Sequence, residues 1–229
     1  MLGVIQARMS SNRFRGKMLT DLEGVTILER VVRQLNKAKN ITKVVVGTSV
    51  EESDNEIQAF CISKGISYYR GPLEDVALRF IEILKKKKSD AFVRISGDSP
   101  AIDPQIIDHA IDTYRNGNFD LVTNVFPRTF PMGQSVEVLS SQKYLDTYEC
   151  FTEDYHFEHV TKYYYENQGK FRIKNLESPV NYASVNLCVD TPGDLNMMAN
   201  ILKFCKNDSQ DFKHLAEAYL HLNNLSEVE

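Results

Sequence analysis

The sequence predicts an α/β protein in which helices cover both faces of a parallel sheet. Up to residue 123, short apolar segments typical of buried strands alternate with longer segments in which apolar residues recur at helical spacing. Parallel strands joined by crossover helices produce this alternation. The 229 residues, 42% of them hydrophobic, suit one large domain with a sizeable core, or one domain with a small appendage.

Strands and helices alternate regularly in this first part of the chain. Strands are expected at Leu2–Gln6, Lys43–Gly47, Ile66–Arg70, Ala91–Ile95 and Phe119–Thr123. Helices are expected at Ile27–Leu35, Ser53–Lys64, Val76–Lys85 and Ile106–Tyr114. In such sheets the ligand lies beyond the carboxyl ends of the strands, so the loops after strands are where chemistry is sought.

The pattern changes after residue 123. The segment 124–133 contains two prolines and is expected to be an irregular connection. Further strands are expected at Ser135–Leu139, Phe171–Leu176 and Ser184–Val189. Amphipathic segments cover Gln142–Tyr148 and His156–Gln168, and the last two helices are expected at Leu195–Phe204 and Asp211–Leu222.

Composition excludes several classes of protein. The 27 basic and 31 acidic residues leave a net charge of −4, which argues against a nucleic-acid-binding protein. No apolar run approaches the roughly 20 residues that a membrane helix needs, and no signal peptide is expected before the first strand. The four cysteines are far apart and are expected to be free thiols. These features indicate a cytoplasmic protein.

The strongest local signal is the segment 6–17, directly after the first strand. It contains four cations among small residues, and no acidic residue occurs between Met1 and Thr20. Small residues let the backbone approach a ligand, and arginine and lysine bring charge to it, so the segment suits a polyanion such as a triphosphate. The spacing is not that of a Walker A loop, and no Gly-x-Gly-x-x-Gly is present. A solvated loop paired with surface acids is the alternative.

Two aspartates follow predicted strands. Asp98 comes after a buried strand in Ser96-Gly97-Asp98-Ser99-Pro100, and Asp190 follows Val189 near the end of a later strand. Mg²⁺ needs only one or two protein carboxylates beside substrate phosphates, so this pair is a candidate magnesium site. Asp103 is interpreted as a helix N-cap, and the same interpretation stays open for Asp190.

Three further polar residues have open interpretations. His156 and His159 share a helical face, but their spacing with Glu158 matches neither zinc-hydrolase motif, which disfavours a zinc hydrolase. Glu137 is the polar residue of an alternating strand and faces either solvent or a site.

Several ordered motifs together resemble a known family, the SpsF-type cytidylyltransferases of bacterial surface-polysaccharide synthesis, which are relatives of the CMP-sialic acid and CMP-Kdo synthetases. The motifs are Ile5-Gln6-Ala7-Arg8-Met9 with Gly16-Lys17, Arg70-Gly71 with Glu74-Asp75-Val76, Arg94-Ile95-Ser96-Gly97-Asp98, Glu158-His159-Val160-Thr161 and Val189-Asp190-Thr191-Pro192. The resemblance implies a single Rossmann-like nucleotidyltransferase domain over residues 1–229. It also implies a mostly parallel sheet, a small β-rich insertion, and a dimerisation region at about 125–185 that makes a homodimer.

The resemblance assigns roles position by position. Catalytic and triphosphate-binding roles fall to Arg8 and Lys17, assisted by Arg13. The backbone of Ala7 approaches the nucleotide, Ser96 and Gly97 read the cytosine or ribose, and Asp98 and Asp190 bind Mg²⁺ and are catalytic. Further nucleotide-side candidates are Arg70, Asp75 and Arg79. The acceptor side is assigned Glu137, Glu158 and His159.

The implied activity is Mg²⁺-dependent transfer of a cytidylyl group from CTP to a nonulosonate- or Kdo-like sugar acid, with release of pyrophosphate. Two departures from the family pattern are visible: Phe14-Arg15 replaces Leu-Pro, and Gly133-Gln134-Ser135-Val136-Glu137-Val138 lacks one carboxylate of Gly-x-Asp-Val-Glu-Val. The acceptor is therefore less defined than the nucleotide. The alternatives are a nucleotidyltransferase that uses another nucleoside triphosphate, and a non-catalytic nucleotide-binding protein with the same fold.

Overall fold

The computed structural model describes residues 1–205 and 211–226. Its centre is a seven-stranded sheet with the strand order β5-β4-β1-β6-β8-β7-β9. All neighbouring pairs are parallel except those that β8 makes with β6 and β7, so the expected mostly parallel sheet is confirmed. The strands are β1 Leu2–Gln6, β4 Lys43–Ser49, β5 Ser67–Gly71, β6 Ala91–Ser96, β7 Leu121–Thr123, β8 Glu137–Ser140 and β9 Ile173–Asn175.

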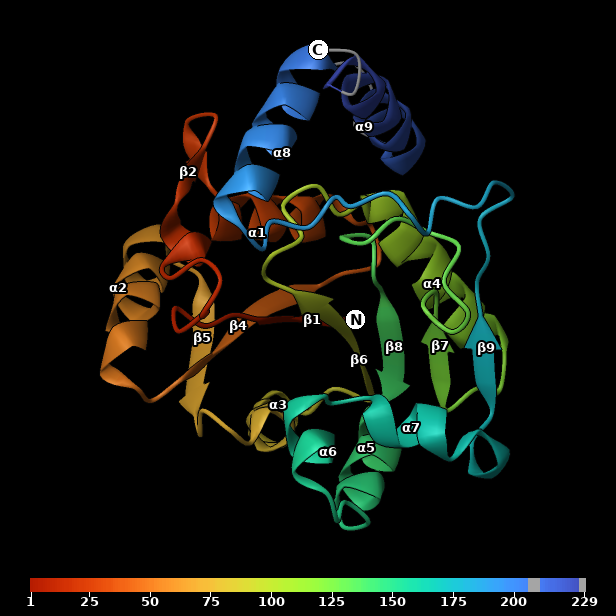
Figure 1. Ribbon diagram of the computed structural model, residues 1–229. Helices are drawn as coiled ribbons and strands as arrows, with labels where there is room; N and C mark the ends of the chain where they lie inside the picture. Colours follow the sequence, from red (N-terminus) through yellow and green to blue (C-terminus); the bar gives the residue numbers. More distant parts are fainter. Residues whose placement is uncertain (206–210, 227–229) are drawn as a thin grey trace.

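Helices cover both faces of this sheet (Figure 1). One face carries α3 Val76–Lys87, α5 Ser141–Tyr148, α6 Asp154–Glu158 and α7 Lys162–Glu166. The other carries α1 Ile27–Lys37, α4 Pro104–Asn116, α8 Pro192–Phe204 and α9 Phe212–Ser226, and α2 Asn55–Lys64 lies beside β5. No helix of the described ranges is long and apolar enough to span a membrane.

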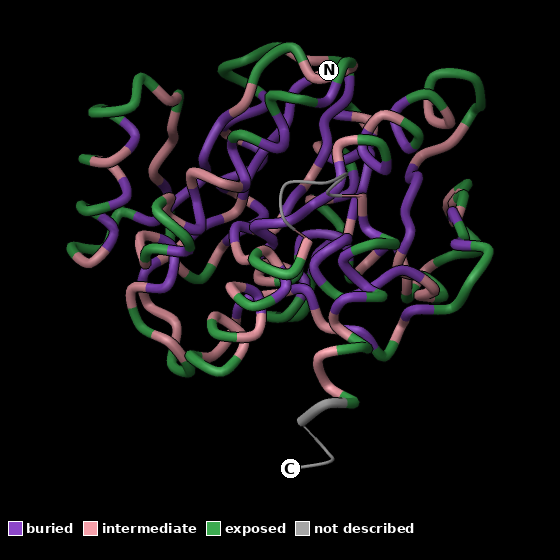
Figure 2. Tube along the Cα trace, turned by 90° about the horizontal axis from the view of Figure 1, so that it is seen from above, coloured by how far each residue is buried: buried purple, intermediate pink, exposed green. Residues whose placement is uncertain are grey.

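Alternation along each strand divides the core into two clusters. Val4 and Val45 pack into the cluster with α3 and α5, whereas Ile5 and Val46 pack into the cluster with α1 and α4. Successive strand side chains point to opposite faces, so a continuous apolar run fills both clusters at once. Figure 2 shows the result, with buried residues along the central strands and exposed residues on the outer turns.

The second half of the chain departs from the expected pattern in two places. The segment expected to be a strand at Ser184–Val189 is not one. Its Asn186 forms only an isolated bridge with Met132. The Cys188 backbone N–H donates to the Asn186 side chain instead of to a neighbouring strand. The amphipathic segment His156–Gln168 is also not continuous, because α6 ends at Glu158 and α7 begins at Lys162.

A small two-stranded β unit accompanies the main sheet, as expected, but it lies near the amino terminus. It is the hairpin of β2 Asp21–Leu22 and β3 Val25–Thr26. The region 125–185 instead contains α5 to α7, and its strands β8 and β9 join the main sheet.

Candidate active site

A buried carboxylate, that of Asp54, binds the start of the segment that follows β1. Asp54 is fully buried and accepts a hydrogen bond from the backbone N–H of Met9 at 2.7 Å. Its second oxygen accepts from the Thr48 hydroxyl at 2.9 Å and from the Ser49 N–H at 2.8 Å, at the end of β4. Asp54 therefore ties the start of the basic segment to the sheet. Sequence reasoning missed this residue, because it stands among acids that look like a solvated turn.

A glycine brings the basic segment back to the sheet. The N–H groups of Ser11 and Gly16 both donate to the carbonyl of Met9, at 2.9 and 3.1 Å, which closes a loop. Gly16 has φ +77°, a conformation that favours glycine, and a short 3₁₀-helix at Lys17–Leu19 follows it. The turn carries Lys17 into a position where it is only 5% exposed.

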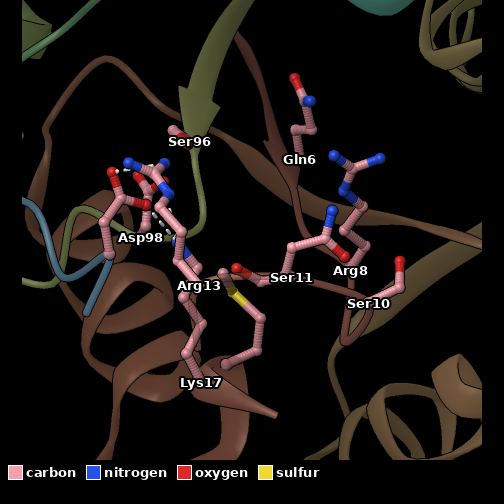
Figure 3. A pocket seen from close by; sticks show the side chains of 11 residues that line it. Gln6, Arg8, Ser10, Ser11, Arg13, Lys17, Ser96 and Asp98 are labelled. Atoms are coloured by element: carbon pink, nitrogen blue, oxygen red, sulfur yellow. Dashed lines mark hydrogen bonds and ion pairs between the residues drawn. The ribbon is translucent and has the colours of Figure 1, made fainter. Parts of the chain in front are cut away.

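A cavity of about 290 Å³ lies at the carboxyl ends of β1 and β6 (Figure 3). We call it the nucleotide cavity. The structure brings six of the predicted site residues together around it: Arg8, Arg13, Lys17, Ser96, Asp98 and Asp190. The remaining lining residues are Gln6, Ser10, Ser11, Asn12 and Met18. This position agrees with the rule that ligands bind beyond the carboxyl ends of parallel strands.

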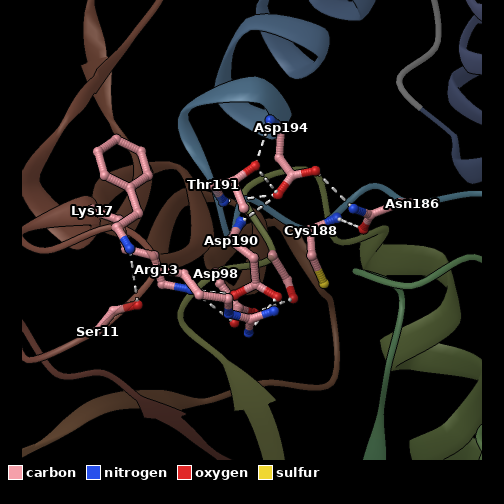
Figure 4. A network of polar contacts seen from close by, with 11 residues as sticks. Ser11, Arg13, Lys17, Asp98, Asn186, Cys188, Asp190, Thr191 and Asp194 are labelled. Carbon is pink, nitrogen blue, oxygen red and sulfur yellow. Dashed lines mark hydrogen bonds and ion pairs between the residues drawn. The ribbon is translucent and has the colours of Figure 1, made fainter.

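The cations and the aspartates of the nucleotide cavity are in direct contact (Figure 4). The Lys17 ammonium lies 2.7 Å from Oδ1 of Asp190 and 3.3 Å from Oδ2 of Asp98. Arg13 reaches the other oxygen of Asp190 at 3.0 Å. The backbone N–H of Val189 donates to the Asp98 carbonyl, which joins the two aspartate segments. Residues from three distant parts of the chain thus form one charged cluster.

The N-cap of α8 is Thr191, not Asp190. Thr191 accepts from the Asp194 N–H, and the Asp194 carboxylate accepts from the backbone N–H groups of Thr191 and Asp190. The Asp190 carboxylate is consequently left to face the cavity. Asp103 does cap α4, as expected, by accepting from the Gln105 N–H at 2.8 Å.

The Asp98 and Asp190 pair fits a hard divalent cation. Both side chains are partly exposed to the cavity, and both contact one cationic group at the same point. In the described ranges no three His, Cys, Asp or Glu side chains group as a closed metal site. Two carboxylates with water and substrate phosphates are what Mg²⁺ requires. Burial, reinforced by the two carboxylates, raises the pKa of the neighbouring Cys188 thiol, so that group stays neutral.

A second cavity, of about 230 Å³, contains two of the predicted acceptor-side residues, Glu137 and His159. We call it the acceptor cavity, after the role that the family resemblance implies for these two residues. Three cations line it, Arg94, Arg128 and Lys162, against the single carboxylate of Glu137. Arg128 donates only to neutral groups in the described structure, the Pro131 carbonyl and the Ser135 hydroxyl. Arg94 pairs with Glu137 and Lys162 pairs with Glu166, so Arg128 carries the excess positive charge of the cavity in the described structure.

Both carboxylate oxygens of Glu137 already accept hydrogen bonds from other side chains of the protein. Glu137 faces Arg94 across the β6–β8 pair, and the Arg94 guanidinium and the Tyr165 hydroxyl each donate to one of its oxygens. Burial alone would lower the pKa of Arg94, but Glu137 raises it above its ordinary value. Burial, with the charge of Glu137, raises the pKa of Tyr165 well above its usual range. Glu137 therefore holds a buried network rather than presenting a free carboxylate.

Three nucleotide-side candidates lie outside the lining of the nucleotide cavity. Arg70 donates to the carbonyls of Ser49 and Glu51, and Asp75 caps α3 and accepts from the Tyr148 hydroxyl at 2.7 Å. Arg79 is 1% exposed, and burial lowers its pKa to about 10. The contacts of these residues support the loops and the helix beside the cavity.

The remaining predicted residues lie at the edge of the nucleotide cavity or beneath it. Glu158 contacts Arg8 at 3.5 Å and lines a neighbouring cavity of about 640 Å³. Ala7 is buried at the end of β1, and the Gly97 N–H donates to the Gln6 carbonyl at 2.8 Å.

Gly97→Ala is expected to lower the free energy of unfolding by about 1–3 kcal/mol and to weaken nucleotide binding. An added Cβ would lie 2.9 Å from the Gln6 carbonyl oxygen and 2.9 Å from the Met18 sulfur, and the backbone oxygen cannot move away. Denaturant unfolding and nucleotide-dependent thermal shifts measure both effects. Gly169→Ala is the control, because nothing lies within 4 Å of its added Cβ. Equal effects of the two substitutions would contradict the prediction.

A basic loop after the first strand, in contact with two aspartates at the carboxyl edge of the sheet, is an arrangement that suits a nucleotidyltransferase. Residues 2–217 match the model of the family described as cytidylyltransferase. The chain belongs to this family and is a cytidylyltransferase enzyme.

Individual relatives agree with this assignment. The spore coat polysaccharide biosynthesis protein SpsF of Bacillus subtilis is 30% identical over 203 residues, covering 85% of this chain and 82% of that protein. A cytidylyltransferase from Leptospira borgpetersenii superposes with a TM-score of 0.88 at 28% identity, over 98% of this chain and 94% of that one. A CMP-2-keto-3-deoxy-manno-octonic acid synthetase, solved with CTP, shares the fold with a TM-score of 0.69 at 19% identity, over 89% and 98% of the two chains.

Proposed function

We propose that this enzyme transfers a cytidylyl group from CTP to a nonulosonate- or Kdo-like sugar acid, with Mg²⁺ and release of pyrophosphate, in surface polysaccharide synthesis. The observation that carries the proposal is the contact of Lys17 with both Asp98 and Asp190 in one cavity. Such a site offers cations for phosphates and carboxylates for a metal ion at the same place. The family assignment and the name of SpsF support the nucleotide and the pathway.

Nucleotide chemistry falls to the cluster at the nucleotide cavity. Arg8, Arg13 and Lys17 would offset the negative charge that develops on the departing pyrophosphate. Asp98 and Asp190 would hold Mg²⁺, whose charge polarises the α-phosphoryl oxygens when it is bound. Ala7, Ser96 and Gly97, at the ends of β1 and β6, would contact the nucleoside. Arg70, Asp75 and Arg79 would support these contacts from behind.

An acidic acceptor fits the charge of the acceptor cavity. Arg128 has Ser135 beside it, at the position where the family pattern carries a carboxylate, so its charge is available to an anionic ligand. The charges of Arg94 and Lys162 are offset by Glu137 and Glu166, and His159 lies in the same lining. Glu158 would act at the edge of the nucleotide cavity by orienting Arg8. A carboxylate on the acceptor would complement this charge.

Incubation with CTP, Mg²⁺ and a panel of sugar acids is expected to release pyrophosphate, and EDTA is expected to abolish the release. Thermal shifts with the four nucleoside triphosphates should be largest for CTP, because preferential binding raises the apparent stability. Equal or larger shifts with another triphosphate would favour the alternative nucleotide. Binding without pyrophosphate release across the whole panel would favour a non-catalytic nucleotide-binding protein.

A homodimer is also proposed, with the interface in the region 125–185. Large apolar side chains are exposed in this region at Phe126, Met132, Tyr155 and Val180. Exposed apolar side chains also occur outside the region, at Val50, Ile62, Phe204 and Leu220, so the family resemblance is what carries this proposal.

A further inference from the structure

The two cavities meet at a pair of side chains that the sequence did not single out as site residues. Gln6, the last residue of β1, lines the nucleotide cavity, and Arg94 of β6 lines the acceptor cavity. The Arg94 guanidinium donates to Oε1 of Gln6 through Nη2 at 3.2 Å and through Nε at 3.4 Å. If the two substrates occupy these cavities, the reacting phosphorus lies near this pair.

The contact with Arg94 determines which way the Gln6 amide faces. A guanidinium group has only donors, so it must bind the oxygen of the amide and not its nitrogen. The Nε2 group, with two N–H donors, is left without a hydrogen-bond partner in the described structure. Figure 3 shows the Gln6 side chain among the cavity residues, between Ser96 and Arg8. The chain therefore presents an uncommitted, neutral donor at the junction of the cavities.

Buried partners hold Arg94 in this position. Glu137 is 3% exposed and accepts from the Arg94 guanidinium. The Tyr165 hydroxyl donates to the other oxygen of Glu137 and lies 2.9 Å from the Thr123 hydroxyl. A donor whose orientation is set before the substrate binds stabilises developing charge without having to reorganise during the reaction.

We propose that Gln6 is a catalytic residue that donates from Nε2 to a non-bridging oxygen of the α-phosphoryl group, and that Arg94 is the positioning residue that orients it. The inference rests on the proposed function. In the transfer, the acceptor hydroxyl oxygen forms a bond to the α-phosphorus while the bond from this phosphorus to the bridging oxygen breaks. Pyrophosphate leaves with the electron pair, and the hydroxyl proton passes to water. Gln6 neither gains nor loses a proton and serves as a hydrogen-bond donor throughout.

Gln6→Glu separates this role from a structural one. Glutamate keeps the size of the side chain and an oxygen for Arg94, so the protein should be at least as stable as the wild type. It lacks both N–H donors and adds a negative charge beside the phosphate. We expect kcat to fall ~100- to 1,000-fold, and the CTP-dependent thermal shift to shrink as well because the added charge repels the phosphate. Gln6→Met is neutral and has no donor, and we expect its kcat to fall ~100-fold. Such a loss would show that removing the donor is sufficient to slow the reaction.

Asn40→Asp is a control with the same change from amide to carboxylate. The Asn40 side-chain oxygen also accepts from an arginine, Arg115, but this exposed pair lies outside the lining of both cavities. Its kcat should match that of the wild type.

Arg94→Lys keeps a positive charge but not the two-donor contact, and we expect a lower kcat with an unchanged KM for CTP. Because Arg94 acts through Gln6, adding Arg94→Lys to Gln6→Met should lower kcat little further.

Two results would overturn the assignment of Gln6. One is a kcat of Gln6→Glu or Gln6→Met close to that of the wild type, and the other is an equal loss of kcat in Asn40→Asp. A fully additive double substitution would overturn the positioning role of Arg94. If the wild type itself releases no pyrophosphate from any nucleotide and acid, the proposed function fails and the role of Gln6 falls with it. If the wild type and the Gln6 variants are all active, only the inference about Gln6 is overturned, and the proposed function stands.

Discussion

Asp98→Asn and Lys17→Ala are each expected to lower pyrophosphate release ~100- to 1,000-fold in a protein that remains folded. Lys17 lies within 3.3 Å of both aspartates, so each substitution removes one charge from the centre of the cluster. Transfer of a phosphoryl group depends mainly on positioning and on charge neutralisation, and losing one such contact typically costs about 3–4 kcal/mol of transition-state stabilisation.

The measurement is a coupled pyrophosphate assay on purified variants, with circular dichroism to establish folding. Asp120→Asn and Lys64→Ala are matched controls, because both residues make ion pairs outside the two cavities, with Arg172 and Glu29. Their turnover should equal that of the wild type. Near-normal turnover of a folded Asp98→Asn or Lys17→Ala protein would remove the charged cluster from the mechanism.

Arg94→Met is expected to lower the free energy of unfolding by about 3 kcal/mol, or the melting temperature by roughly 6–12 °C. The substitution leaves the carboxylate of Glu137 buried, with the Tyr165 hydroxyl as its remaining side-chain donor. The cost comes from an uncompensated buried charge rather than from the net value of the pair. Glu137→Leu should be destabilising for the reciprocal reason.

Denaturant unfolding of both single variants and of the double variant tests this account. The double variant Arg94→Met/Glu137→Leu should recover more than half of the loss, because no unpaired charge remains. Arg115→Met is the control, since its pair with Asp112 is exposed and 3.9 Å long, and it should change stability by less than about 1 kcal/mol. A double variant whose loss equals the sum of the singles would show that the two residues do not act as a pair.

Local patterns were sufficient for most of the secondary structure. The apolar runs at β1, β4 and β6 and the helical spacing in α1 and α3 predicted these elements within a few residues. Gly65, with φ +65°, ends α2 as a glycine C-cap does, and Asp103 caps α4. These features depend on neighbours within one or two turns, so the sequence contains all the information they need.

The exceptions are segments whose backbone partners are distant. The segment Ser184–Val189 has strand-like residues, yet Met132 and the Asn186 side chain satisfy its backbone groups without a ladder. The hairpin β2–β3 is too short for an alternating pattern to show. The direction of β8, antiparallel within the sheet, follows from the path of the chain and not from its residues.

The candidate site divides in the same way. Residue types and their positions after strands predicted a candidate phosphate-binding loop and a candidate pair of metal-binding aspartates without reference to a fold. The tertiary structure was needed to establish that Lys17 meets partners 81 and 173 residues away, and that Asp54 anchors the loop. It also revealed that Glu137 accepts from Arg94 and Tyr165, and that the Gln6 amide oxygen accepts from Arg94. Contacts between distant segments depend on the order of the strands in the sheet. No local sequence pattern predicts that order.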